Sequence, residues 1–434
     1  MRGLPPGPHG TRRASCLLIL VTTLPPAADP SRMTPAERRA SASLAAVFAS
    51  RMLGLFLVLP VFALEAARYP GGNDASMVGL AMGIYGLTQG LLQIPFGMAS
   101  DRFGRKRVIV LGLLVFAGGS FVAAAADSLL WLIVGRSLQG AGAVSAAVTA
   151  LLADQTRDEV RTKAMAMVGA SIGLMFALSL VAAPLLAARI GLAGLFGLTG
   201  LLALACIAVV LWWTPPAPAV QKNVPRGRLA EVLAHAPLLR LNVGVFVLHA
   251  VQLAMWVAIP ALLVQAGLGK DSHWAVYLPA VLGSFVVMAA TLFPLERRGY
   301  LRAVFLASVG LVGLVQLGLL AVAPQPGIAG LAVLLFLFFC GFNVLEASQP
   351  SMASRVAPPH ARGTALGVYN TLQSLGFFAG GAVGGWLAEH VGVQGLFAAC
   401  AGLMFLWLAV AWPMRAPARQ QSAEEVLADE AQAT

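Results

Sequence analysis

Twelve long stretches of mainly apolar residues recur along this chain of 434 residues. Each is about 20 residues long, which is enough for a helix to cross a hydrocarbon core of about 30 Å. They lie near residues 43–66, 76–96, 108–126, 130–152, 163–188, 192–213, 238–266, 274–294, 302–323, 328–352, 363–389 and 393–413. With 59% hydrophobic and only 11% charged residues, the chain departs from the composition of soluble domains. We therefore expect an all-α protein that crosses the membrane many times.

A proline-rich polar segment divides the twelve runs into two sets of six. This segment, residues 214–237, reads TPPAPAVQKNVPRGRLAEVLAHAP and is typical of a linker. The two sets echo each other, because RTKAMAMVGA at the start of the fifth run resembles RGTALGVYNT at the start of the eleventh. The predicted parts are an N-terminal tail over 1–40, a six-helix bundle over 41–213, the linker over 214–237, a second six-helix bundle over 238–414 and a tail over 415–434.

Lysine and arginine are distributed unevenly between the loops. Loops after the even-numbered runs hold sixteen of them, whereas loops after the odd-numbered runs hold only Arg68, Arg189 and Lys270. Because basic loops stay in the cytoplasm, we expect both termini and the linker on the cytoplasmic side. The formal net charge of +11 does not indicate nucleic-acid binding, since the bases lie in short loops and form no continuous basic face.

The first 32 residues differ from the rest of the chain. The stretch CLLILVTTLPPAA, which follows TRRAS, resembles a secretory signal peptide. However, the sequence from Met33 onward begins a first span that can insert without a cleaved signal. We interpret residues 1–32 as a misassigned start or a disordered tail.

The loop between the second and third runs, GMASDRFGRKRV, concentrates charge in a short turn. It is similar to the signature Gly-x-Leu-a-Asp-Arg-x-Gly-Arg-Lys of the major facilitator superfamily at Gly97, Asp101, Arg102, Gly104, Arg105 and Lys106. In the fourth run GRSLQGAGA resembles a second motif of that family, and RMLGLFLVLPVFAL in the first run resembles its drug/proton antiporter branch. One departure is Ala183-Pro184 in the fifth run, where antiporters have Gly-Pro. Some members carry a soluble domain after the last helix, for which residues 415–434 are too short.

The resemblance implies a fold of twelve transmembrane helices in two six-helix bundles. It also implies a cytoplasmic latch between the bundles, in which Asp101 lies at the positive N-terminal end of the eleventh helix, starting near Gly363. In this latch Arg105 pairs with Asp154, and the contacts stabilise the outward-open state. The latch residues are Gly97, Asp101, Arg102, Gly104, Arg105, Lys106 and Asp154. For Arg102 a purely topological role as a cytoplasmic positive charge stays equally open.

Ionisable side chains inside the apolar runs are few, and each costs about 2.5 to 3.5 kcal/mol to insert, which makes them functional candidates. They are Arg51 in the first run, Arg136 in the fourth, His249 in the seventh and Glu346 in the tenth. Glu346 is the only acid deep in a run, and we expect it to bind and release the coupled proton near neutral pH. The alternative is a static Glu346 neutralised by an arginine, and both His249 and Arg136 can equally be hydrogen-bonded packing residues.

Uncharged polar side chains recur at helical spacing in several runs and are candidates for the lining of a cavity. They are Tyr85, Gln89 and Gln93 in the second run, Gln139 in the fourth, Asn343 and Gln349 in the tenth, and Tyr369, Asn370 and Gln373 in the eleventh. Asn343 and Gln349 flank Glu346 at three-residue spacing, so all three can face one cavity. We interpret these residues as lining either the central path or the moving interface between the bundles.

Together these features predict a proton-coupled secondary transporter that exports small amphipathic or drug-like compounds by alternating access. The expected partners are a small-molecule substrate, protons and the lipid bilayer of a bacterial inner membrane, and we expect a monomer. We expect no cofactor, metal or nucleic acid. The four cysteines form no CxxC pair and indicate packing rather than disulfides or metal ligation.

Four other functions compete with export. The first is a proton-coupled importer of a small polar solute, and the second is a membrane sensor that uses the transporter fold without transport. A channel is disfavoured by the two-bundle arrangement. An enzyme is disfavoured because the sequence has no HExxH, GxSxG, P-loop or metal-spaced His/Cys cluster.

Overall fold

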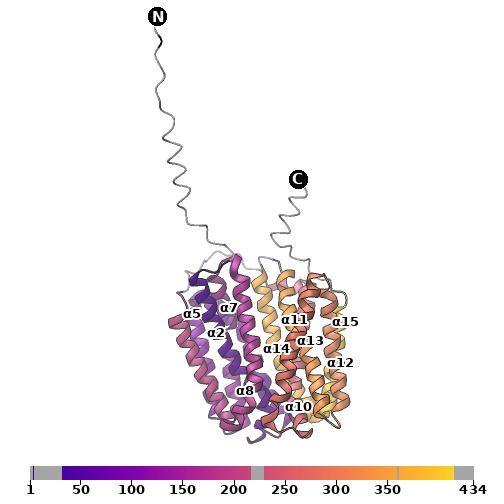
Figure 1. Cartoon of the computed structure of the whole chain (residues 1–434). Helices are drawn as coiled ribbons and strands as arrows, with labels where there is room; N and C mark the ends of the chain where they lie inside the picture. The colour runs from indigo at the N-terminus through magenta and orange to yellow at the C-terminus, as the bar shows by residue number, and fades with distance from the viewer. Residues whose placement is uncertain (1–2, 4–31, 217–228, 359–360, 415–434) are drawn as a thin grey trace.

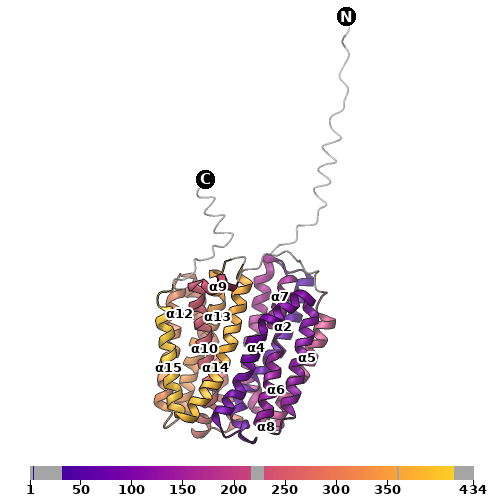
Figure 2. The ribbon, with the colours of Figure 1, turned by 180° about the vertical axis from the view of Figure 1, so that it is seen from behind.

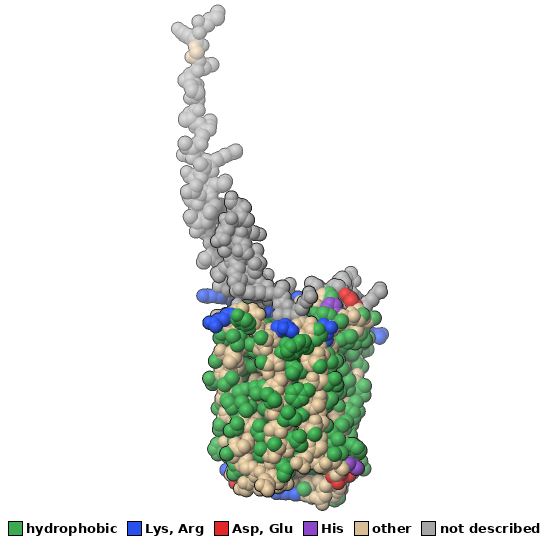
Figure 3. All heavy atoms as spheres, turned by 90° about the vertical axis from the view of Figure 1, so that its right-hand side faces the viewer, with side chains coloured by type: hydrophobic (Ala, Val, Ile, Leu, Met, Phe, Trp, Pro, Cys, Tyr) green, Lys and Arg blue, Asp and Glu red, His purple; other side chains and the backbone are tan. Residues whose placement is uncertain are grey.

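The computed structural model describes Gly3 and residues 32–216, 229–358 and 361–414, and within these ranges the regular elements are all helices. Almost all of the predicted N-terminal tail, residues 217–228 of the linker and the whole predicted tail over 415–434 lie outside the described part. The helices run side by side in one bundle-like body (Figure 1). Hydrophobic side chains cover its flank, and Lys and Arg gather around one end (Figure 3). This distribution is what a lipid bilayer requires of a protein surface.

Within residues 32–216 the chain folds into seven α-helices and a short π-helix. They are α2 (Pro35–Phe56), α3 (Leu59–Ala66), α4 (Ala75–Phe103), α5 (Arg105–Ala124), α6 (Leu129–Ala141), α7 (Ser145–Asp154), α8 (Asp158–Ala208) and η1 (Val209–Trp213). The first apolar run is divided into α2 and α3 just before Pro60, which has no N–H to continue the helical ladder. The fourth run is likewise divided into α6 and α7, at Gly142.

The second half repeats this pattern of long helices. Its elements are α9 (Leu229–Ala234), α10 (Ala236–Gln265), the 3-10 helix η2 (Lys270–Ser272), α11 (Trp274–Arg297), α12 (Leu301–Val322), α13 (Ile328–Val356), α14 (Arg362–His390) and α15 (Gly392–Ala411). The predicted runs and the observed helices agree to within a few residues at most ends. The short helix α9 lies within the segment that the sequence predicts as linker.

Ten helical segments of the described part are long and apolar enough to cross a membrane. The difference from twelve predicted runs arises at two places. The 51-residue α8 covers both the fifth and the sixth runs and changes direction at Gly191, where φ is 64°. The helix α14, which corresponds to the eleventh run, is 29 residues long but rich in glycine and polar residues, so it falls outside the ten. A total of twelve membrane crossings stays a prediction.

The two halves of the chain form two packed sets of helices that meet along α4 and α14 (Figure 2). In the first set α2 packs on α8, and α5 packs on α6; in the second set α10 packs on α14, and α12 packs on α13 and α15. The backbones of α4 and α14 touch, because a Cβ on Gly79 would lie 2.2 Å from the carbonyl oxygen of Gly381. Small residues at such crossings allow membrane helices to approach closely.

The two ends of the body differ in how the sets meet. We call the end that holds the start of α2, the end of η1 and α9 the linker end, and the other the opposite end (Figure 2). At the opposite end the Glu389 carboxylate accepts a hydrogen bond from the Ala75 N–H over 2.8 Å. Towards the linker end the glycine contacts on α14 extend as far as Gly90, where a Cβ would lie 3.3 Å from Leu375, whereas a Cβ on Gly97 would meet only Ala146 of α7. The described state is therefore closed between α4 and α14 at the opposite end.

Candidate functional site

An acid and an imidazole from two different helices meet inside the second helix set. Glu346 lies in α13 and His249 in α10, and 3.2 Å separates Glu346 Oε2 from His249 Nε2. The His249 side chain is only 2% exposed. The Glu346 side chain is 41% exposed although its Oε2 atom is itself buried. One carboxylate oxygen thus faces the histidine while the rest of the side chain remains accessible.

A third helix contributes an amide to this pair. Gln373 of α14 places its Nε2 2.8 Å from His249 Nε2 and 3.3 Å from Glu346 Oε1. On the other side of the ring, His249 Nδ1 lies 2.8 Å from the carbonyl oxygen of Val245. A carbonyl can only accept, so Nδ1 carries a proton and Nε2 is the nitrogen that changes state. We call Glu346, His249 and Gln373 the acid–imidazole–amide cluster.

Within the described part of the chain, the polar residues that flank Glu346 in the sequence form no hydrogen bond with the acid–imidazole–amide cluster. Asn343 donates to Ser284 of α11 over 2.8 Å. Gln349 is fully buried, and neither of its amide atoms has a hydrogen-bond partner within the described residues. The three-residue spacing therefore does not bring all three side chains to the acid–imidazole–amide cluster. No described arginine neutralises Glu346, whose described ionic partner is His249.

Two arginines are buried together in the first helix set. Arg51 of α2 donates to the hydroxyl oxygens of Ser145 and Tyr85, and the contact with Tyr85 is 2.8 Å long. Arg136 of α6 lies over the Tyr85 ring, with its Cζ 5.0 Å from the ring centre. It donates to the carbonyl oxygen of Met82 over 3.2 Å. Among the residues that the structure describes, no carboxylate forms an ion pair with either arginine.

The other predicted cavity-lining residues differ in their exposure. Most are buried, with exposed fractions of a few per cent or less: Tyr85, Gln93, Gln139, Asn343, Gln349 and Tyr369. Gln89, Asn370 and Gln373 are partly exposed. Gln139 is anchored within its own set, because it accepts from Arg136 over 3.1 Å and donates to Ser120 over 2.8 Å.

The charged turn between α4 and α5 is held together by one arginine. Arg105 forms ion pairs with Asp101 and with Asp154, the latter over 2.9 Å between Nε and Oδ2. It also donates to the Ser100 hydroxyl over 2.8 Å. Gly104 has a φ of 96°, which favours glycine at the point where α4 turns into α5. The turn therefore ties α4 and α5 to the end of α7 within the first helix set.

Two other members of the predicted latch point elsewhere. Lys106 donates to the carbonyl oxygen of Thr214 over 2.6 Å and so holds the end of η1. The guanidinium of Arg102 lies 5.5 Å from the centre of the Phe103 ring. Gly97 lies in the last turns of α4, near Ala146 of α7.

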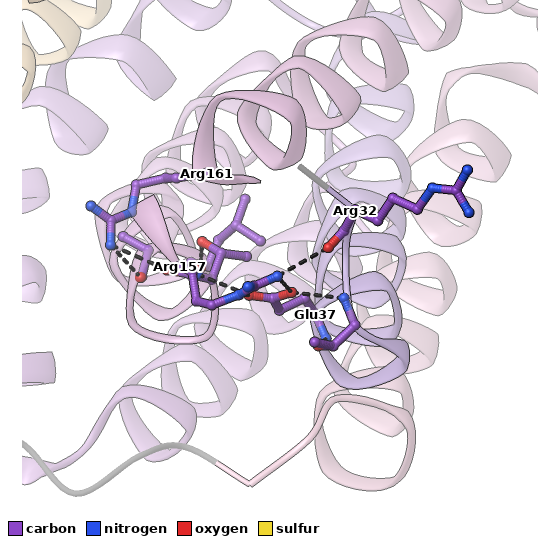
Figure 4. Close-up of polar contacts among 8 residues, drawn as sticks. Arg32, Glu37, Arg157 and Arg161 are labelled. Carbon is purple, nitrogen blue, oxygen red and sulfur yellow. Dashed lines mark hydrogen bonds and ion pairs between the residues drawn. The ribbon is translucent and has the colours of Figure 1, made fainter. Parts of the chain in front are cut away.

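A second ionic cluster at the linker end was not predicted from the sequence. Glu37 accepts hydrogen bonds from the backbone and the guanidinium of Arg157, with the shortest contact at 2.8 Å (Figure 4). Arg157 also donates to the carbonyl oxygen of Arg32 over 3.0 Å. Glu37 completes a capping box with Thr34, a pattern that the sequence Thr-Pro-Ala-Glu could have revealed.

An apolar exterior and two sets of long helices, each with charged side chains buried inside it, are typical of a membrane transporter. The family model described as Major Facilitator Superfamily matches residues 42–381 and 295–431. The chain therefore belongs to the major facilitator superfamily, and it has the all-α membrane fold of that family.

Three individual proteins are similar to most of this chain. The chain is 43% identical over 390 residues to the inner membrane transport protein YajR of Escherichia coli K12, covering 89% of this chain and 85% of that protein. It is 29% identical over 363 residues to the multidrug resistance protein MdtH of Aeromonas salmonicida, covering 79% and 86% respectively. Among solved structures, the human organic anion transporter MFSD10 shares the fold with a TM-score of 0.65 at 19% identity, covering 87% of this chain and all of that one.

Proposed function

We propose that this protein is a proton-coupled secondary transporter that exports small amphipathic compounds by alternating access. The observation that carries the proposal is the contact between Glu346 and His249 inside the second helix set. A carboxyl group that is accessible on one side and faces an imidazole on the other can gain and lose a proton without leaving its place. The names of the relatives YajR and MdtH support transport and export respectively.

The proposed cycle uses the charge of this pair. A proton that enters from outside binds the pair of Glu346 and His249, cancels its net negative charge and lowers the cost of enclosing the pair while the two helix sets rock. Release of that proton on the other side restores the charge and prepares the site for substrate. Proton entry thereby drives substrate exit.

We infer the orientation from the basic loops. The loops after the even-numbered runs hold sixteen Lys and Arg in the sequence, so we assign the linker end to the cytoplasm and both termini to the inside. The described state, closed at the opposite end, is then the one that faces the cytoplasm. We place the protein in the inner membrane as a monomer.

The latch at the charged turn belongs to the same proposal. In the outward-open state Asp101 moves to the N-terminal end of α14, where the helix dipole favours an anion. The ion pair between Arg105 and Asp154 keeps the turn in position for this contact. Breaking and remaking the contact accompanies each half-cycle.

The test is transport driven by a pH gradient in proteoliposomes, with a panel of lipophilic cations as substrates. We expect wild-type protein to couple substrate movement to proton movement. Glu346→Gln keeps the size of the side chain but removes its titration, so it should abolish gradient-driven transport while substrate exchange without a gradient continues. Asp127→Asn, which changes an exposed acid in the loop before α6, is the matched control and should behave like the wild type.

Gradient-driven transport that survives Glu346→Gln would refute the assignment of the proton site. Proton-coupled uptake in the same direction as the proton, rather than exchange against it, would indicate an importer. If no compound moves with any driving force, the sensor hypothesis is favoured over transport.

A further inference from the structure

We propose that Gln373 is a positioning residue whose amide N–H competes with the coupled proton for one lone pair of His249. Displacement of the Gln373 side chain then changes how α14 packs on α4. The proposal rests on the proposed role of Glu346 and His249 in proton coupling. It assigns to an uncharged residue of a third helix the task of linking protonation to helix movement.

The competition follows from the chemistry of the imidazole ring. His249 Nδ1 donates to the carbonyl oxygen of Val245, so Nε2 has a single in-plane lone pair when the ring is neutral. In the described geometry the Gln373 amide nitrogen, 2.8 Å away, donates to this lone pair. The same amide group donates to Glu346 Oε1 at 3.3 Å. One amide thus binds both members of the unprotonated pair.

A proton on His249 Nε2 removes this acceptor. The new N–H points to Glu346 Oε2, 3.2 Å away, and forms an ion pair with the carboxylate. The Gln373 N–H then faces another N–H and has to leave. Turning the amide over does not resolve the conflict, because its oxygen would face Glu346 Oε1 with no hydrogen between them.

The His249 ring cannot rotate away from Gln373 and Glu346. Phe342 and Phe377 hold it edge to face, with ring centres 5.9 and 4.9 Å from that of His249. A further titratable group, on which Glu346 acts electrostatically, is Tyr369 of α14, whose buried hydroxyl has no described hydrogen-bond partner. A tyrosine is uncharged near neutral pH, so the exchange of donors at His249 Nε2 is the event that changes with pH.

The backbone next to Gln373 is in direct contact with α4 of the other helix set, so a movement of Gln373 can alter the packing there. A Cβ on Gly86 of α4 would lie 2.3 Å from the carbonyl oxygen of Ser374, the residue that follows Gln373. On its other face α14 contacts α10, where a Cβ on Gly376 would lie 2.4 Å from the carbonyl oxygen of Phe246. The helix α14 is therefore wedged between two backbones and has no free space on these faces. A displacement of Gln373 shifts the surface on which α4 packs.

The experiment measures amide hydrogen exchange of the α4 and α14 segments in lipid nanodiscs between about pH 5 and pH 8. The exchange is corrected for its intrinsic pH dependence. Gln373→Met keeps the length of the side chain but has no N–H, so we expect the pH-dependent change in protection to fall at least about fivefold. Gln373→Glu adds a second carboxylate beside Glu346, which favours proton binding and should move the midpoint to higher pH.

The matched control is Gln316→Met. Gln316 is a fully buried glutamine of α12 in the same helix set, and its amide donates to Met255 Sδ away from the cluster. We expect its pH response to equal that of the wild type. The proposal is overturned if Gln373→Met keeps the wild-type amplitude and midpoint, or if Gln316→Met reduces the response equally.

The outcome separates this inference from the proposed function. If Glu346→Gln abolishes gradient-driven transport while Gln373→Met responds to pH as the wild type does, coupling through Glu346 stands and the role of Gln373 is refuted. If Glu346→Gln transports normally, the proton site itself is wrong, whatever Gln373 does.

Discussion

At the scale of single residues, the two helix sets handle buried charge differently. In the first set Arg51 and Arg136 carry fixed positive charges that are satisfied by hydroxyl and carbonyl oxygens. In the second set Glu346 and His249 form a pair whose charge can change. The geometry of Arg136 is that of a structural residue, because its donors reach the backbone of α4 at Ala81 and Met82.

Replacing Arg136 should therefore reduce stability. In Arg136→Met the Gln139 amide oxygen loses its described donor in a buried place, which costs about 1 to 3 kcal/mol for a group left unpaired, while the carbonyl groups of Ala81 and Met82 keep their helical hydrogen bonds and lose only a second donor. We expect a lower midpoint of thermal unfolding in detergent. Arg189→Met, at an exposed position of α8, provides the control and should leave the midpoint unchanged. An unchanged midpoint in Arg136→Met would contradict the structural role.

The identity of these four ionisable residues could be predicted from the sequence, but their partners could not. The cost of placing a charge in an apolar run is a property of each residue, so Arg51, Arg136, His249 and Glu346 stand out without a structure. Which of them meet depends on how each helix is rotated about its axis. The sequence placed Gln373 in a polar stripe of the eleventh run, and only the packing of α10, α13 and α14 brings it to His249.

At the scale of helices, the contact between α4 and α14 depends on the absence of side chains. Gly79 and Gly83 of α4 face Gly381 and Gly385 of α14 at backbone contact distance. Because nothing lies between the two backbones, one added methyl group has no room. These close contacts therefore hold the two helix sets together at the opposite end.

Gly381→Ala should disrupt this close contact between α4 and α14. Its Cβ would lie 2.5 Å from the carbonyl oxygen of Gly79, and overpacking of this kind costs about 1 to 3 kcal/mol. We expect a lower thermal midpoint and slower transport than in the wild type. Gly402→Ala in α15, where a Cβ meets open space, should keep both, since alanine favours a helix over glycine. Equal behaviour of the two variants would show that the close approach is not required.

The lengths of the helices could be predicted well, and their interruptions could not. Hydropathy marks where a span begins and ends, which is why the runs match α10, α11 and α12 closely. It does not register the breaks at Val58 and Gly142, because the residues there are as apolar as their neighbours. The glycine-rich α14 shows the reverse case, since it is a full-length helix with a weak hydropathy signal.

At the scale of the whole molecule, we expect the orientation to follow from basic side chains near the helix ends. The first set ends at its linker end in contacts from basic side chains to backbone carbonyls, as where Arg39 and Lys106 bind Trp213 and Thr214. The second set repeats this arrangement where Arg302 binds Met414 over 2.7 Å. The same basic side chains that bind the ends of neighbouring helices thus also favour one topology in the membrane.

Fusions at two positions test this orientation in bacterial cells. A green fluorescent protein attached after Thr434 should fluoresce, because it folds in the cytoplasm. Alkaline phosphatase attached after Asp127, between α5 and α6, should be active, because it matures outside. The opposite pattern, with a dark C-terminal fusion and inactive phosphatase, would reverse the assigned topology.

The closed opposite end has a further consequence for the medium in which the protein works. Two of the contacts that join the sets there are electrostatic: the carboxylate of Glu389 on the N–H of Ala75, and Lys270 Nζ at 3.9 Å from Glu65 Oε1. The Lys270 side chain is 48% exposed, so dissolved ions reach it freely. The screening length falls from about 8 Å at physiological ionic strength to about 3 Å in 1 M salt. In the proposed cycle, we therefore expect the balance between the two states to shift with salinity on that side of the membrane.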